Sequence, residues 1–385
     1  MPSGWAGSDV QLFTPLKAQA WLLPGVSNLV VGWEANQPGS MTFRVAQAAV
    51  QQVGPSSSGW TLDLDVLSMG GTTNASNPVP TDGGFLLGKW VEYTHPSAGL
   101  WGGRVTSVSY EDGLLSVGAE GYLSLLRAQR PNYGDGEVAL QQFLDSMLSR
   151  AMLGRGMTYT LAGVPNVPVQ AGSYDVLTDV VAQAIEEKVA DGSPGYLSLN
   201  PATRALKIFD TNPQPGGQVT LAAGNNVIGW TVGQDLWAGA NSLMVQQRYL
   251  EKSGKKTIKK TAKLWVSTSD LSGRIPYDID RIDRVEVESV QLSGVRQSYS
   301  AAQTVAQNLV RARSRDFLTF TLRLVDLNGT FAGLASANTY GYVPVTLDLG
   351  PITQGPTNTT RPVVNVVARS LDVQTGVMTA TAVWE

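Results

Sequence analysis

Residues 103–119 read GRVTSVSYEDGLLSVGA and contain the clearest secondary-structure signal in the chain. Two alternating runs, residues 103–110 and 114–119, flank the tripeptide Glu111-Asp112-Gly113. An Asp-Gly pair between such runs favours a two-residue turn with positive φ angles, so the stretch predicts a β-hairpin. Alternation of apolar and polar residues also predicts that one face of the sheet is buried.

Strand signals continue upstream of this hairpin. Short runs rich in β-branched and aromatic residues occupy residues 11–14, 29–33, 41–45, 60–66 and 85–93. About seven strands at short spacing are typical of a barrel or sandwich, so we predict an N-terminal β-barrel over residues 1–130, ending in a short helix at 122–127. A Gly/Asn/Pro-rich segment between Val66 and Phe85 is long for a loop in a compact domain, which indicates a functional or mobile loop.

The pattern changes after residue 130. Apolar residues recur at helical spacing over residues 137–153 and again over 173–190, with Gly154 and Gly192 as stop signals. Two short strands then flank Asn200-Pro201, which favours a turn. We therefore predict a small α+β domain over residues 131–215.

Strands return from about residue 219. The candidate strands cover residues 227–232, 241–249, 261–266, 284–288, 317–325, 342–347, 363–368 and 377–384, and one further helix is expected at 300–315. We predict a second β-barrel over residues 216–385 with a connecting helix near 300–315. The fold class is thus mainly β with an α+β insert, in which two separate β-barrel domains flank a small helix-containing domain.

Composition excludes many kinds of catalytic site. The 385 residues include no Cys and one His, which excludes thiolate sites, disulfides and multi-His metal sites within one chain. His95 follows a strand candidate, and we interpret it as a turn or surface residue. Asp278, Asp280 and Asp283 lack the Gly and Glu of a calcium loop and alternate with arginines, so we expect no metal site, no cofactor and no catalytic residue.

Lysine is concentrated in one segment. Six of the ten lysines lie within twelve residues: Lys252, Lys255, Lys256, Lys259, Lys260 and Lys263. One interpretation is a solvated hairpin tip between Tyr249 and Trp265. The other is a projecting arm that contacts an acidic partner, nucleic acid or a neighbouring subunit. We take these lysines as candidate assembly contacts.

Two other features bear on partners. The chain has ten Trp, which invites a carbohydrate-binding hypothesis, but Trp33, Trp230 and Trp265 lie inside apolar strand candidates and favour core positions. The N-terminus lacks the basic and apolar regions of a signal peptide, and the longest apolar runs are too short to cross a bilayer. We therefore expect folding in a cytoplasm-like compartment and no membrane insertion.

The order of these segments resembles the tail or baseplate hub family of tailed bacteriophages. Residues 102–126 are similar to the hub pattern of strand, hairpin, strand and short helix, and residues 173–181 to the helix before its small inserted sheet. Residues 240–245 are similar to the strand that opens the second barrel. The helix from Ser300, the Tyr340-Gly-Tyr-Val343 turn region and the final hairpin resemble the family's ending.

The resemblance implies two tail-tube-like β-barrels in each subunit and a non-enzymatic homotrimer. Such a trimeric ring adapts the six-fold tail tube to the three-fold tip and helps form the channel for DNA ejection. The implied partners are the tail tube or distal-tail ring protein, tail-tip fibre or spike proteins, the tape-measure protein and DNA in transit. The implied location is the virion, after assembly in the host bacterial cytoplasm.

Two alternatives stay open at this point. A distal-tail ring subunit would form a hexamer with one barrel and a peripheral domain. A carbohydrate-binding module for host attachment would need grooves lined by surface Trp. A peptidoglycan hydrolase is disfavoured, because no catalytic motif is recognisable.

Overall fold

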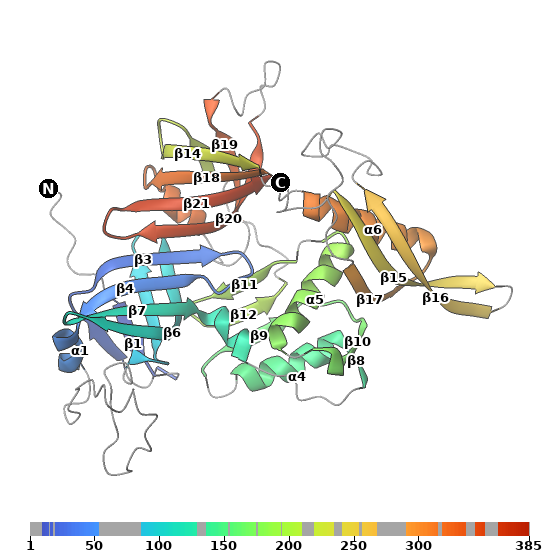
Figure 1. The fold of residues 1–385 in the computed structure, drawn as a ribbon, viewed down its shortest axis with the longest axis horizontal. Coiled ribbons are helices and arrows are strands. Elements are labelled where there is room, and N and C mark those ends of the chain that lie inside the picture. The colour runs from blue at the N-terminus through green and yellow to red at the C-terminus, as the bar shows by residue number, and fades with distance from the viewer. Residues whose placement is uncertain are drawn as a thin grey trace, which may run out of the picture.

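The computed structural model describes most of the chain. The described residues are 10–14, 16–17, 20–53, 86–128, 136–152, 155–174, 176–193, 195–209, 219–234, 241–253, 256–267, 290–314, 318–335, 343–350 and 361–384. They form a mainly β structure with a helix-containing insert (Figure 1), which confirms the predicted mainly β class with an α+β insert. The predicted strands at 60–66 and 284–288, the loop before Phe85 and the three aspartates from Asp278 lie outside these residues.

Among the described residues, thirteen strands from the two ends of the chain form one sheet. The N-terminal region contributes β1 (Val10–Phe13), β2 (Ala20–Leu23), β3 (Ser27–Glu34), β4 (Ser40–Ala46), β5 (Trp90–His95), β6 (Gly99–Glu111) and β7 (Leu114–Gly121). The C-terminal region contributes β13 (Val219–Ala222), β14 (Val227–Gln234), β18 (Leu318–Val325), β19 (Val343–Asp348), β20 (Val363–Asp372) and β21 (Val377–Trp384). The main order is β14-β18-β21-β20-β3-β4-β7-β6-β5-β1-β2, with β19 beside β20 and β13 beside β19.

Strand β20 joins the two regions. Its first residues pair with β19, whereas residues 368–372 pair with β3, after a bulge at Val366/Ala368 in its pairing with β21. Our expectation that the two end regions form separate sheets is therefore wrong. The physical reason is that the free edges of β3 and β20 satisfy each other's backbone groups. One buried apolar cluster accordingly includes side chains from both ends of the chain, such as Val31, Phe43 and Leu371.

The predicted hairpin at 103–119 is confirmed as β6 and β7. Their turn has φ angles of 48° at Asp112 and 82° at Gly113, as an Asp-Gly turn of this kind requires. A helix of the 3-10 type, Tyr122–Ala128, follows directly. Short helices α1 (Gln47–Val53) and α7 (Thr330–Ala335) accompany the strands of this sheet.

The insert has its own core. It consists of β8 (Glu137–Ala139), α4 (Leu140–Met152), β9 (Thr158–Leu161), β10 (Pro168–Gln170), a 3-10 turn (Ala171–Ser173), α5 (Leu177–Ala190), β11 (Leu197–Asn200) and β12 (Ala205–Ile208). Helices α4 and α5 bury their apolar faces in a cluster separate from that of the large sheet. Both predicted helices exist, but α4 begins three residues later than expected, because residues 137–139 pair with β10.

A buried ionic network fixes the insert to the large sheet. Arg204, in the turn between β11 and β12, contacts Glu92 of β5 at 3.3 Å, and Tyr122 donates a 2.6 Å hydrogen bond to the same carboxylate. Lys17 binds the other oxygen of Glu92 at 2.9 Å. The Arg204 guanidinium also lies over the ring of Trp90 at 4.8 Å. The buried carboxylate is thus neutralised from two directions, as a buried charge requires.

A third unit lies beside α5, at the right of Figure 1. It contains β15 (Ser242–Ser253), β16 (Lys256–Ser267), β17 (Val290–Arg296) and α6 (Tyr299–Arg313), with strand order β16-β15-β17. Helix α6 is capped by Ser298, whose side chain accepts a hydrogen bond from the Ala301 N–H. These strands do not join the large sheet, so residues 216–385 do not form one β-barrel as predicted. They are separate because their buried face packs on α6 and forms its own apolar cluster.

Candidate assembly interface

The lysine-rich segment forms the hairpin of β15 and β16. The two twelve-residue strands pair without interruption from Ser242↔Ser267 to Ser253↔Lys256. Figure 1 shows this hairpin, in yellow, extending beyond α6 to the end of the molecule. Every residue of β16 from Lys256 to Thr261 is exposed. The prediction of a projecting hairpin is confirmed, although its strands extend further toward the tip than the sequence pattern indicated.

Alternation along the strands gives the hairpin two faces. The helix face carries Leu243, Val245, Gln247, Ala262, Leu264 and Val266, all buried toward α6, and continues toward the tip with Lys256, Ile258 and Lys260. The open face carries Met244, Gln246, Arg248, Leu250 and Lys252 on β15, and Thr257, Lys259, Thr261, Lys263 and Trp265 on β16. The candidate lysines are therefore divided between two faces, and Lys255 lies outside the described residues.

The two faces differ in their charge balance. On the helix face, Lys260 forms an ion pair with Glu251, and this contact raises the pKa of Lys260. On the open face, Lys259 and Lys263 are exposed, and Trp265 beside them is 54% exposed. The expectation of a core position is thus wrong for Trp265, because the strand has an apolar helix face and a solvent face. It holds for Trp33, which is buried, while Trp230 is half-buried.

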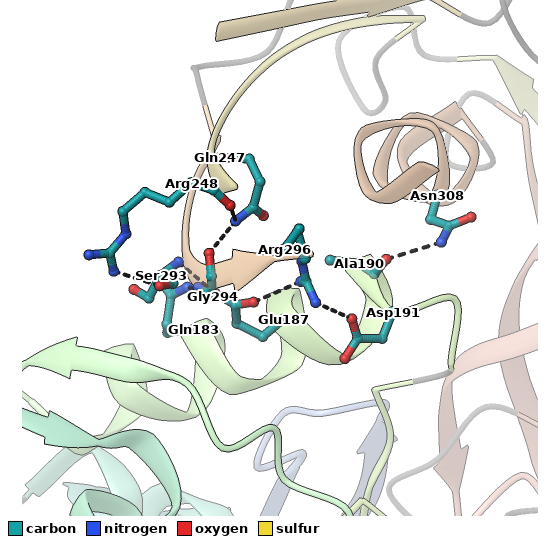
Figure 2. Close-up of polar contacts among 10 residues, drawn as sticks. All are labelled: Gln183, Glu187, Ala190, Asp191, Gln247, Arg248, Ser293, Gly294, Arg296 and Asn308. Carbon is teal, nitrogen blue, oxygen red and sulfur yellow. Dashed lines mark hydrogen bonds and ion pairs between the residues drawn. The ribbon is translucent and has the colours of Figure 1, made fainter. Parts of the chain in front are cut away.

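The base of the hairpin is attached to helix α5 through the carboxylate of Glu187. Between β15 and β17 the pairing shifts, so that residues 292–294 bulge opposite Gln247. The bulge directs the N–H groups of Ser293 and Gly294 toward Glu187, whose Oε1 accepts from them at 2.6 and 3.0 Å (Figure 2). Glu187 is fully buried, and burial raises its pKa, while the Gly294 N–H and Arg296 act in the opposite direction.

Further polar contacts surround Glu187 in Figure 2. Arg296 binds Oε2 of Glu187 at 3.2 Å and Asp191 at 2.5 Å. Gln247 donates hydrogen bonds to the carbonyl oxygens of Gly294 and Arg248. Arg248 donates a 2.6 Å hydrogen bond to the carbonyl oxygen of Ser293. These contacts fix the base of β15 to β17, and β17 to α5.

Helix α6 is attached to the same end of α5. Asn308 donates a 3.0 Å hydrogen bond to the carbonyl oxygen of Ala190, and Arg313 pairs with Glu186 at 3.1 Å. Arg311 and Arg313 lie in the last turn of α6, where cations complement the dipole of their own helix. The pairing of Arg313 with α5 shows a second role, which depends on a tertiary contact.

A polar recess of about 410 Å³ lies where the open face meets the insert. Gln246, Arg248 and Thr261 line it from the hairpin, and Tyr174 and Gln183 line it from the insert. The open face is therefore continuous with this recess at its base, whereas α6 covers the helix face at the same level.

His95 has a structural role at the end of β5. Its side chain is 7% exposed, so the expected surface position is wrong, although the expected turn is present. Nδ1 accepts hydrogen bonds from the N–H groups of Ser97 at 3.2 Å and Ala98 at 3.0 Å. Burial lowers the pKa of His95, while the charge of Asp326 acts in the opposite direction.

The described residues offer no group of three or more His, Asp or Glu side chains that could hold a metal ion. Within the same part of the chain, no helix is long and apolar enough to cross a membrane. Sequence reasoning missed Glu187, but a signal existed. Glu187 follows Ala184 by three positions and Val180 by seven, so it lies on the apolar face of α5.

No protein-family model and no curated protein sequence matches this chain. Several solved structures match the chain over nearly its whole length. The prophage tail protein gp18 from Listeria monocytogenes EGD-e aligns over 98% of this chain and 94% of its own, with 14% identity and a TM-score of 0.51. The tail protein from Neisseria meningitidis MC58 aligns over 98% and 97%, with 11% identity and a TM-score of 0.55. The 43 kDa tail protein of prophage MuSo2 from Shewanella oneidensis aligns over 97% and 98%, also with 11% identity and a TM-score of 0.55. The chain has the fold of these tail proteins.

Proposed function

We propose that this chain is a structural, non-enzymatic subunit of a bacteriophage tail and a member of the tail or baseplate hub family. The observation that carries the proposal is the end-to-end alignment. Three tail proteins match almost their whole length to almost the whole of this chain, which supports a fold shared over the full chain. The order of segments that resembles the hub family in the sequence supports the same assignment.

In this proposal three copies form a ring at the tail tip. Each subunit contributes β-rich regions from both ends of its chain to the wall of the ring, so that three subunits match a six-fold tail tube. The pairing of five residues of β20 with β3 supports this arrangement, because it holds the β-rich regions from the two ends of one subunit side by side. The ring would surround the channel through which DNA leaves the virion.

The proposed partners are other tail components: the tube or distal-tail ring protein, the tape-measure protein and the tip fibres or spike. The lysines of the β15–β16 hairpin, Lys252, Lys255, Lys256, Lys259, Lys260 and Lys263, are the proposed assembly contacts. The projection of the hairpin and the exposure of its described lysines support this role. A glycan-binding function has less support, since Trp265 is the one described Trp with more than half of its side chain exposed.

Mass and symmetry of the assembled particle test the proposal. The full chain, expressed with the neighbouring genes of its own tail cluster, should yield a particle with three copies in a closed ring, seen by native mass spectrometry and electron microscopy. Six copies in the ring would favour the distal-tail alternative. A monomer that never joins a tail particle would contradict both.

A further inference from the structure

Charge is strongly segregated in this chain. Residues 242–267 contain seven Lys and Arg and one Glu, which gives this hairpin a formal charge of +6. The rest of the chain contains 21 Lys and Arg and 30 Asp and Glu, which gives it −9. A basic projection on an acidic body is attracted to the body of another copy, and this attraction acts at distances of about 10 Å at moderate salt.

The open face of the hairpin has the features of a contact surface. Trp265 is 54% exposed and lies on the same face as the exposed Lys259 and Lys263. Trp is among the residues that contribute most when they are covered in protein interfaces. The outer edge of β16 adds backbone groups that no described strand pairs with. At the base, the face continues into the recess at Arg248 and Thr261.

From these observations we infer that the open face of the β15–β16 hairpin, with the recess at its base, docks on an acidic surface of a second copy of this chain. The inference rests on the proposed function only in requiring that copies of the chain meet. It commits to one of the two faces, because Lys260 on the helix face is already paired with Glu251, and α6 covers the base of that face.

A simpler role for the lysines is protection of an edge strand against accidental pairing. That role, like a general electrostatic attraction, depends on the charge of the strand and not on the face that carries it. Two double variants separate these explanations. Lys259→Ser with Lys263→Ser removes two charges from the open face, and Lys256→Ser with Lys260→Ser removes two charges from the helix face of the same strand.

Self-association of the full chain, measured by sedimentation velocity in about 50 mM and about 500 mM NaCl, is the test. We expect the parent to associate more tightly at low salt. The open-face variant should weaken association about tenfold, and the helix-face variant less than about threefold. Trp265→Ser should also weaken association about tenfold, at both salt concentrations, because the contact of its ring is not screened. Circular dichroism and thermal melting check that each variant is folded.

Equal effects of the two lysine pairs would overturn the inference, and so would a parent that stays monomeric at both salt concentrations. A third outcome would assign the face to nucleic acid. In that case the parent binds a short DNA duplex, and the open-face substitutions alone weaken this binding while self-association stays unchanged. The proposed function fails separately. If the open-face variant forms three-fold rings as well as the parent, this contact is contradicted and the hub assignment stands. If the parent associates through the open face but forms no three-fold ring, the hub assignment is contradicted and this contact stands.

Discussion

Glu187 and Gly294 are 107 residues apart in the sequence, and the Glu187 carboxylate accepts a 3.0 Å hydrogen bond from the Gly294 N–H. This bond joins the last turns of α5 to the bulge of β17, and β17 pairs with the base of the projecting hairpin. Because an extended hairpin amplifies any rotation at its base, the direction in which it points depends on this buried carboxylate. Loosening the contact should therefore change assembly as well as stability.

Replacing Glu187 with Ala should lower the free energy of unfolding by about 3 kcal/mol, because it leaves buried donors without an acceptor and Arg296 without its buried partner. Urea unfolding of the parent and the variant measures this change. Glu186→Ala is the matched control, since Glu186 pairs with Arg313 at a half-exposed site. Its cost should stay within about 1 kcal/mol. Similar losses for both variants would contradict the special role of Glu187.

The raised pKa of Glu187 also predicts a pH dependence. A carboxyl with a raised folded-state pKa stabilises the fold most below its unfolded pKa, and this contribution is lost as the pH rises through the folded pKa. Between about pH 4.5 and neutrality, the parent should thus lose stability relative to Glu187→Gln, which does not ionise. If the stabilities of the two proteins change equally with pH over this range, burial does not dominate the pKa of the Glu187 carboxyl.

The hairpin turn offers a test of backbone conformation alone. Gly113 has φ of 82°, and no atom lies within 4 Å of the position that a Cβ would occupy there, so Gly113→Ala introduces strain without a clash. We expect a loss of about 1 kcal/mol in the free energy of unfolding. Gly136 is equally open but lacks a positive φ, so Gly136→Ala should be close to neutral. A neutral Gly113→Ala would contradict the turn assignment.

This hairpin also shows why part of the fold was predictable. Strand, turn and partner strand lie within residues 99–121, so local alternation and one Asp-Gly pair specify them. The pairing of β20 with β3 joins residues more than 330 positions apart. Each strand has the same pattern in one sheet or in two, so the sequence alone does not distinguish these cases. Likewise, the position of Glu187 on the apolar face of α5 is visible in the helical spacing, but its role as an acceptor at a bulge in β17 is not.

His95 should make stability fall at mildly acidic pH. Its Nδ1 accepts two backbone N–H groups, so the neutral form is the one that fits, and burial lowers its pKa below the usual value. The stability from a depressed pKa is present above the unfolded value of about 6.5 and is lost as the pH falls through the folded value. His95→Asn retains a side-chain acceptor and does not titrate, so its stability should change less between about pH 7 and pH 5. The free energy of unfolding at each pH is measured by chemical denaturation. If it falls equally with pH in both proteins, the acid sensitivity belongs to other groups.

Changing Lys255, Lys256, Lys259 and Lys260 to Ser should leave the fold nearly intact. The three of these lysines within the described residues are exposed, and the ion pair of Lys260 with Glu251 lies at the surface, where such pairs contribute about 0–1 kcal/mol. The melting temperature should therefore shift by no more than about 4 °C in differential scanning calorimetry.

Assembly of this variant with tail partners should weaken instead. The parent should lose affinity with added salt more steeply than the variant, because it has four more charges to screen. Misfolding of the variant would show that the lysines stabilise the hairpin itself. Unchanged assembly at low salt would show that these four lysines are not assembly contacts.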